Sequence, residues 1–221
     1  MFFATLIAGL VVISACSVAA GVLLANVLSH SWGIGTANRH VVAWLAGHRT
    51  PGRTSASLVG SIMAGGVTLP IVVAAIGLVC AIFRKWRIAA FAVFGLIAES
   101  SAYRITTFFF HEHRPRVPRL EKLPVNASYP SGHTAASIAV YCGIALLLTS
   151  KFANPVFRVA VWAIAVSIPI FVGLSRMYRG MHYPLDVLGG AFVGSASFVL
   201  IVFACRVAGA AAAAREDPAA R

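Results

Sequence analysis

A short stretch late in the sequence places a histidine and an aspartate at a spacing suited to nucleophilic or acid–base chemistry. His182 and Asp186 lie four residues apart in HYPLD, and Pro184 between them suits the first turn of a helix. If helical geometry begins near His182, both side chains lie on one face. A carboxylate bonded to one imidazole nitrogen makes the other nitrogen more basic. The pair alone fits equally well an aspartate placed at a helix start by the helix dipole.

A second candidate lies in YPSGHTAAS, residues 129–137, directly before a long apolar run. Ser131 can cap a helix that starts here, and Gly132 lets a ligand approach the backbone closely. The free amides and the positive dipole end of a helix start favour an anion. His133 on the first turn could protonate a departing oxygen. On its own, however, the stretch is more simply interpreted as a capped helix with a histidine at a membrane surface.

Two arginines precede these histidines along the chain. Arg176 comes six residues before His182 in SRMYRGMH, and Arg114 begins RPR in the loop before YPSGHTAAS. A guanidinium group is planar, stays charged and matches phosphate oxygens with several donors. A single arginine at a membrane interface more often only anchors the protein to lipid headgroups, so neither arginine is diagnostic alone.

Composition identifies the setting in which these residues act. The chain is 59% hydrophobic and only 11% charged, with a mean hydropathy of +0.86, which indicates an integral membrane protein. The net charge of +12 suits anionic lipid headgroups or phosphate-bearing substrates, and no soluble basic domain is present to bind nucleic acid. The cysteines all lie in apolar runs without metal-type spacing and predict no disulfide framework: Cys16, Cys80, Cys142 and Cys205.

Six apolar runs are each long enough to cross a membrane as a helix, and they predict an all-α bundle with an interfacial active site. We expect one six-helix domain over 1–206, with its core at 57–206, followed by an Ala-rich tail at 207–221. Pro70 is expected to kink the second run. Residues 29–56 are expected to hold an interfacial helix. The predicted spans are 2–28, 57–83, 88–110, 132–150, 156–174 and 184–206.

Helix parity places the loops after the third and fifth predicted helices on the same membrane face. These loops contain the candidate arginines and histidines, so they should converge on one site. Lys and Arg are nearly balanced between the two faces, but the dense RKWR turn at 84–87 remains once the site's own arginines are discounted. This turn predicts that both termini are cytoplasmic and that the site faces outward.

Taken together, the motifs resemble the type 2 phosphatidic acid phosphatase superfamily. The resemblance rests on Arg114 with its following proline, on Ser131-Gly132-His133, and on Arg176 followed by His182 and Asp186. It implies that His182 attacks phosphorus and forms a phosphohistidine, that Asp186 holds its imidazole and that His133 protonates the leaving oxygen. The phosphoryl oxygens would be held by Arg114, Ser131, Gly132 and Arg176. Such charge stabilisation requires no metal or other cofactor.

One position departs from the family pattern. The first family signature begins with a lysine seven residues before the arginine, and Thr107 stands there in this chain. Arg104, one helical turn earlier, could reach the same phosphate and compensate. Glu99, an acid within a predicted span, has no role in the signatures, and a structural role is expected for it. His111 and His113 form HEH, a weak signal for metal because no third ligand is placed nearby.

The sequence therefore predicts an enzyme that hydrolyses a lipid phosphate or diphosphate in a bacterial plasma membrane. A polyprenyl diphosphate, phosphatidate and phosphatidylglycerol phosphate are among the candidate substrates. One alternative is a phosphotransferase that passes the phosphoryl group to an acceptor alcohol. Another is a non-enzymatic anion transporter, although no internal repeat typical of transporters is evident. Neither the oligomeric state nor the lipid tail is predicted.

Overall fold

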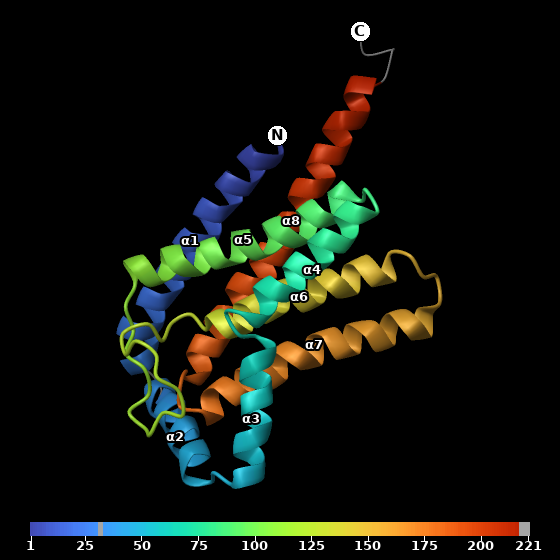
Figure 1. Ribbon diagram of the computed structural model, residues 1–221. Coiled ribbons are helices and arrows are strands. Elements are labelled where there is room, and N and C mark those ends of the chain that lie inside the picture. Colours follow the sequence, from blue (N-terminus) through green and yellow to red (C-terminus); the bar gives the residue numbers. More distant parts are fainter. Residues whose placement is uncertain (31–32, 217–221) are drawn as a thin grey trace.

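The protein is all-helical over the residues that its computed structural model describes, 1–30 and 33–216, with no strand among them (Figure 1). Trp32, within the segment expected to be interfacial, lies outside the described residues. A 3-10 turn, Leu28–His30, follows the first helix. The α-helices are α1 Phe2–Asn26, α2 Ile34–Gly47, α3 Pro51–Met63, α4 Thr68–Ile82, α5 Trp86–Phe109, α6 Gly132–Thr149, α7 Pro155–Tyr178 and α8 Pro184–Glu216.

The predicted spans correspond to these helices, with one span broken. Within the described chain, α1, α5, α6, α7 and α8 are each long and apolar enough to cross a membrane. The α3–α4 pair supplies a sixth span if it counts as one, bent by 44°. The expected kink at Pro70 was wrong, because the break lies earlier, around Gly65 and Gly66. Pro70 is the third residue of α4, where a helix start has no intrahelical acceptor for an N–H.

Two helices end later than the sequence predicted. α7 continues to Tyr178 rather than 174, so Arg176 is part of a helix and not of a loop. α8 continues to Glu216 rather than ending at 206. The added residues of α8 are rich in alanine, the residue with the highest helix propensity, which explains the continuation. The interfacial helix expected within 29–56 corresponds to α2.

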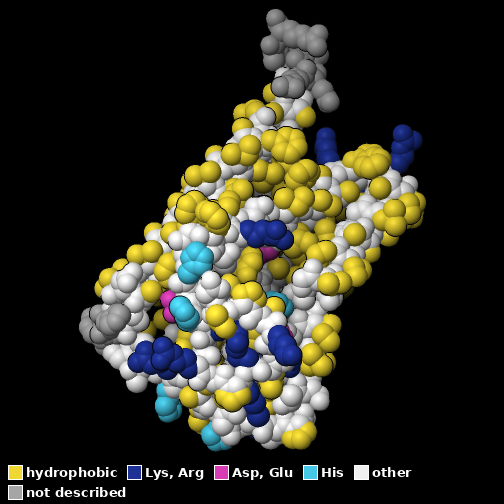
Figure 2. Space-filling view, turned by 60° about the vertical axis from the view of Figure 1, so that its left-hand side comes forward, with side chains coloured by type: hydrophobic (Ala, Val, Ile, Leu, Met, Phe, Trp, Pro, Cys, Tyr) yellow, Lys and Arg dark blue, Asp and Glu magenta, His cyan; other side chains and the backbone are white. Residues whose placement is uncertain are grey.

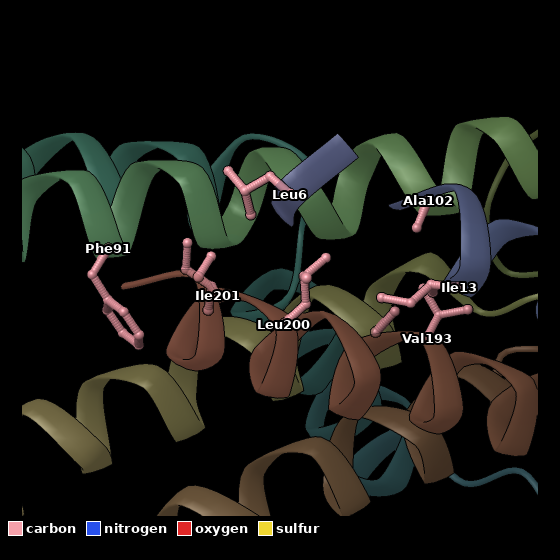
Figure 3. Packing of buried hydrophobic residues seen from close by; sticks show 9 residues of the cluster. Leu6, Ile13, Phe91, Ala102, Val193, Leu200 and Ile201 are labelled. Carbon is pink, nitrogen blue, oxygen red and sulfur yellow. The ribbon is translucent and has the colours of Figure 1, made fainter. Parts of the chain in front are cut away.

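Helix α8 is at the centre of the packing, in contact with α1, α5 and α6. The hydrophobic cluster between them includes Leu6 and Ile13 from α1, Phe91 from α5, and Val193 and Ile201 from α8 (Figure 3). A second cluster joins α4 to α6 and α7 through Leu69, Val140 and Val172. Many large apolar side chains on the outer helix faces remain exposed, as expected for surfaces that meet lipid.

Glycines allow the start of α6 to lie directly against α8. A Cβ atom at Gly190 would overlap the backbone carbonyl of Ser131, and one at Gly194 would overlap that of Ala135. The four-residue spacing of the two glycines is the small-residue pattern that lets membrane helices approach closely. This contact fixes the position of the α6 N-terminus, where the candidate residues Ser131, Gly132 and His133 lie.

We predict that Gly194→Ala destabilises the protein, because the added methyl group must push α6 away from α8. Overpacking of this kind costs about 1–3 kcal/mol, which should lower the midpoint of thermal unfolding measured in detergent. Gly209→Ala in the same helix is the matched control, because a Cβ there meets nothing within 4 Å. Equal unfolding midpoints for the two variants would contradict the close packing.

Candidate active site

The two loops that helix parity places on one face meet in the structure. The backbone N–H of Leu120 donates to the carbonyl of Arg179 at 3.1 Å, and the Arg114 side chain donates to the carbonyl of Met181 at 2.6 Å. At the helix starts, the N–H of Ser131 donates to the carbonyl of Asp186 at 2.9 Å. Residues more than fifty positions apart are thereby joined around one site, and the predicted convergence is confirmed.

A cavity of about 360 Å³ lies between these loops and the helix ends, and a hollow with charged side chains at its edges is visible in Figure 2. Most of the predicted site residues line it: Arg104, Arg114, Gly132, His133, Arg176 and His182. Ser131 and Asp186 are buried behind this lining. The wall is completed by the α3–α4 break and by the side of α5 that carries Glu99 and Tyr103.

His182 is buried and held in one tautomer. Its Nδ1 atom lies 2.6 Å from the backbone carbonyl oxygen of Ser128, which can only accept, so neutral His182 carries its proton on Nδ1. The Nε2 atom therefore presents a lone pair. This lone pair accepts a long hydrogen bond from Nη1 of Arg114, at 3.4 Å. His182 thus places the lone pair of Nε2 beside a cation.

Asp186 is adjacent to the imidazole but bonded elsewhere. Its Oδ2 atom lies 3.8 Å from Nδ1 of His182, a distance that allows charge interaction but no hydrogen bond. The same oxygen accepts from the Ser128 hydroxyl at 2.5 Å and from the backbone N–H of Tyr183 at 2.7 Å. The latter bond caps the start of α8. The direct Asp–His bond expected from the sequence is replaced by a bridge through Ser128.

Ser128 is a site residue that the sequence reasoning missed. It donates to Asp186 through its side chain and accepts from His182 through its carbonyl, and it is fully buried. It lies one residue before YPSGHTAAS, and nothing in its type or spacing marks it.

Arg114 and Arg176 differ in how completely their donors are used. Arg114 donates through Nε to the carbonyl of Pro124 at 2.7 Å and through Nη1 to that of Met181. Arg176 has no exposed surface, yet its Nε and Nη2 atoms have no partner among the described residues. Its Nη1 atom donates to Glu121 at 2.7 Å and also to the Ser61 hydroxyl. Buried donors left open beside a cavity are the arrangement expected of an anion site.

The start of α6 adds backbone donors to the same cavity. Ser131 occupies the N-cap position as predicted, but its hydroxyl lies 3.0 Å from that of Thr134 and makes no cap bond to the backbone. The amides of the first helical turn have no acceptor within the helix. Gly132 is in close contact with the ring of Tyr103: a Cβ would lie 3.0 Å from it. His133, half-buried, completes this wall.

Arg104 and Thr107 differ in whether they line the cavity. The Thr107 hydroxyl donates to the carbonyls of Tyr103 and Arg104, at 3.1 and 3.0 Å, and Thr107 does not line the cavity. Arg104 is exposed and does line it. Arg104, the cation predicted to compensate for the missing lysine, therefore lies beside the site, and its compensation stays a prediction.

Two acids and the HEH motif complete the description. Glu99 is buried on the cavity wall and accepts from the Ser100 hydroxyl at 3.2 Å. Glu121, whose role the sequence reasoning missed, accepts from Arg176 and from Nε of Arg179, the latter at 2.5 Å. Acidic residues are rare in this chain, and this rarity was the sign in the sequence that Glu121 has a role. His111 and His113 are exposed, and the described part of the chain contains no group of three His, Cys, Asp or Glu placed to hold a metal.

Comparisons with known proteins place the chain in a family. A family model described as the PAP2 superfamily matches residues 87–208. Over 76 residues the chain is 41% identical to an undecaprenyl-diphosphatase of Sulfolobus acidocaldarius, covering 34% of this chain and 32% of that protein. It is 40% identical over 76 residues to phosphatidylglycerophosphatase B of Bacillus subtilis, covering 34% and 37%. The matches thus span about a third of the length of these relatives.

The fold has a counterpart among solved structures. The crystal structure of a transmembrane PAP2 type phosphatidylglycerolphosphate phosphatase from Bacillus subtilis matches with a TM-score of 0.75, over 88% of this chain and 94% of that one. At 22% identity this likeness establishes a shared fold. The all-α membrane bundle predicted from the sequence is confirmed.

We predict that the imidazole of His182 stays neutral at pH values where a free histidine is half protonated. Burial lowers the pKa of His182, and the neighbouring Asp186 offsets this only in part. The folded state therefore favours the neutral form. Its contribution to stability is complete above the unfolded-state pKa of about 6.5 and is lost progressively as the pH falls below it.

Histidine-selective NMR on the detergent-solubilised protein tests this, with His182→Asn identifying the resonance. A midpoint for His182 at or above that of a free histidine, about 6.5, would contradict the prediction.

Proposed function

Because the chain belongs to the PAP2 superfamily, as the resemblance in its motifs indicated, we propose that it hydrolyses a lipid phosphate or diphosphate through a phosphohistidine on His182. The chain is an integral membrane protein, and its cavity lies where the ends of the long apolar helices meet polar loops. One observation carries the proposal: His182, whose Nε2 lone pair lies beside Arg114, and Arg176, which has unpartnered donors, line the same cavity.

The first step is attack on phosphorus by the Nε2 lone pair of His182. The new N–P bond forms as the bond from phosphorus to the lipid oxygen breaks, and that oxygen departs with the electron pair. His133, in its protonated form, transfers a proton to the departing oxygen. The imidazole becomes cationic once Nε2 is phosphorylated, because Nδ1 keeps its proton. The carboxylate of Asp186, at 3.8 Å, and the Ser128 carbonyl stabilise this charge.

The second step is hydrolysis of the phosphohistidine. His133, now neutral, removes a proton from a water molecule, and the water oxygen bonds to phosphorus as the N–P bond breaks. The electron pair returns to Nε2, inorganic phosphate leaves, and His133 is again protonated. In both steps negative charge spreads over the equatorial oxygens of the phosphoryl group. Arg114, Arg176 and the first-turn amides of α6 are placed to stabilise that charge.

The position of the site suits a substrate whose tail remains in the bilayer. The relatives named above act on a polyprenyl diphosphate and on phosphatidylglycerol phosphate, and both classes are proposed for this chain, together with phosphatidate. The proposed setting is a bacterial plasma membrane with both termini cytoplasmic and the cavity facing outward. The basic turn at 84–87, on the face opposite the cavity, supports this orientation.

We expect purified protein in detergent to release inorganic phosphate from at least one lipid of this panel, with no loss of rate in chelator. His182→Asn should lower the rate by about a thousandfold or more, because the nucleophile is removed. Base-quenched reactions should contain a phosphorylated peptide that includes His182 and loses phosphate in acid.

The outcomes of this experiment separate the competing functions. Release that depends on an added alcohol, with a phosphorylated alcohol as product, would indicate the phosphotransferase. An unchanged rate in the His182→Asn protein would overturn the phosphohistidine mechanism. Loss of activity in chelator would revive a metal site.

We further predict that Arg104→Ala lowers kcat by at least about tenfold without loss of folded protein, because a cation beside the phosphate is removed. Thr107→Val is the matched control on the same helix face. Its hydroxyl is used by its own helix and does not line the cavity, so near-normal activity is expected. Phosphate release by both variants is measured at equal amounts of monodisperse protein. Near-normal activity of Arg104→Ala would show that Arg104 does not compensate for the missing lysine.

A further inference from the structure

Arg176 is a buried cation held at one end only. The side chain has no exposed surface, and it projects from the last turn of α7 toward the 110–131 loop and α3. Its Nη1 atom donates to the Glu121 carboxylate and to the Ser61 hydroxyl. Its Nε and Nη2 atoms have no acceptor within the described chain.

The two open nitrogens form one edge of the guanidinium plane. An N–H on Nε and the adjacent N–H on Nη2 are nearly parallel, and such a pair can bind two oxygens of a phosphoryl group at once. Arg176 lines the cavity, so this buried edge belongs to a residue of the cavity wall. The direction of this edge depends on what holds the opposite end of the group.

Glu121 is the anion at that opposite end. One carboxylate oxygen accepts from Arg176 at 2.7 Å, and the other accepts from Arg179 at 2.5 Å and from the Ser61 hydroxyl at 2.7 Å. Burial opposes ionisation of Glu121, but the charge of Arg176 and hydrogen bonds from Arg176, Ser61 and Arg179 prevail, and its pKa falls to about 2. The carboxylate is therefore ionised throughout the physiological range. Glu121 does not line the cavity.

We propose that Glu121 is a positioning residue that holds the Nη1 end of Arg176 so that the Nε–Nη2 edge faces the phosphoryl group. The proposal rests on the proposed function, because it assigns a purpose to that edge. Glu121 also separates two cations, Arg176 and Arg179, that would otherwise repel each other across a buried space. It lies in the loop that carries Arg114, so the same segment supplies one phosphate-binding arginine and orients the other.

Glu121→Gln tests the proposal, because the amide keeps the size of the side chain and removes its charge. We expect kcat to fall about tenfold or more while KM changes about threefold or less, since a misdirected guanidinium loses most in the transition state. Glu121→Asp retains the charge and should recover part of the loss. The matched control is Glu112→Gln, which changes another half-buried acid of the same loop that has no side-chain hydrogen bond in the described structure. The proposal is overturned if the kcat of Glu121→Gln lies within about twofold of the kcat of Glu112→Gln.

A double-mutant cycle distinguishes positioning from a general structural role. Arg176→Lys removes the two-nitrogen edge, so adding Glu121→Gln to it should lower kcat by only about twofold more. If the kcat losses of the two single variants multiply fully in the double variant, Glu121 acts independently of Arg176, and the proposal is overturned. The midpoint of thermal unfolding is measured for each variant, and a loss of activity that merely follows a loss of folded protein would likewise count against it.

A ligand-binding assay separates failure of this inference from failure of the proposed function. Orthovanadate imitates the five-coordinate phosphorus of phosphoryl transfer and should raise the unfolding midpoint of the parental protein. Glu121→Gln should weaken its binding about tenfold, and Glu112→Gln should leave it unchanged. If the protein does not hydrolyse lipid phosphate but its vanadate binding depends on Glu121, the proposed function is rejected and the positioning role is retained. If the protein hydrolyses lipid phosphate but its vanadate binding does not depend on Glu121, the proposed function is retained and the positioning role is rejected.

Discussion

The site depends on keeping several cations and imidazoles together among buried side chains. A buried charge is costly unless it is paired or hydrogen-bonded, and within a membrane protein the helices offer few acceptors. The chain supplies them at places where helices end. The carbonyls of Ser128, Pro124 and Met181 accept from His182 and Arg114, and the carboxylate of Glu121 accepts from Arg176. Irregular backbone around the cavity is therefore what allows the basic residues to be buried.

This requirement explains why the loop between α5 and α6 is long and why it lies over the end of α7. Arginine side chains pin it to its neighbours: Arg49 donates to the Pro118 carbonyl at 2.7 Å and also to the carbonyl of Tyr178. The backbone bond from Leu120 to Arg179 adds a further link. Much of the chain's positive charge near the site thus has a structural use in fixing the loop, in addition to attracting an anion.

The sequence was informative where chemistry limits the choice of residue and less so where packing or backbone geometry decides. Histidines, arginines and the helix-start glycine occur in recognisable spacings, so most of the predicted site residues line the cavity, whereas the α3–α4 break and Tyr103 were not foreseen as part of its wall. Helix parity placed the two loops together because apolar span length is a strong signal. Ser128 could not be foreseen, because its carbonyl acts through backbone position and any residue has a carbonyl. Glu121 was visible only as a rare acid, and its partner Arg176 is distant in sequence.

The break between α3 and α4 has a consequence for hydration. Backbone N–H and C=O groups freed at membrane depth are stable only where protein or water satisfies them. Protein supplies part of this at the break, since the Met63 carbonyl accepts from the Tyr141 hydroxyl at 2.8 Å. Residues of this break, including Gly65 and Gly66, line the cavity opposite the histidines. An uninterrupted helix there would present a sealed, apolar wall. The interruption instead places polar backbone at the cavity, which is where the proposed hydrolytic step requires a water molecule.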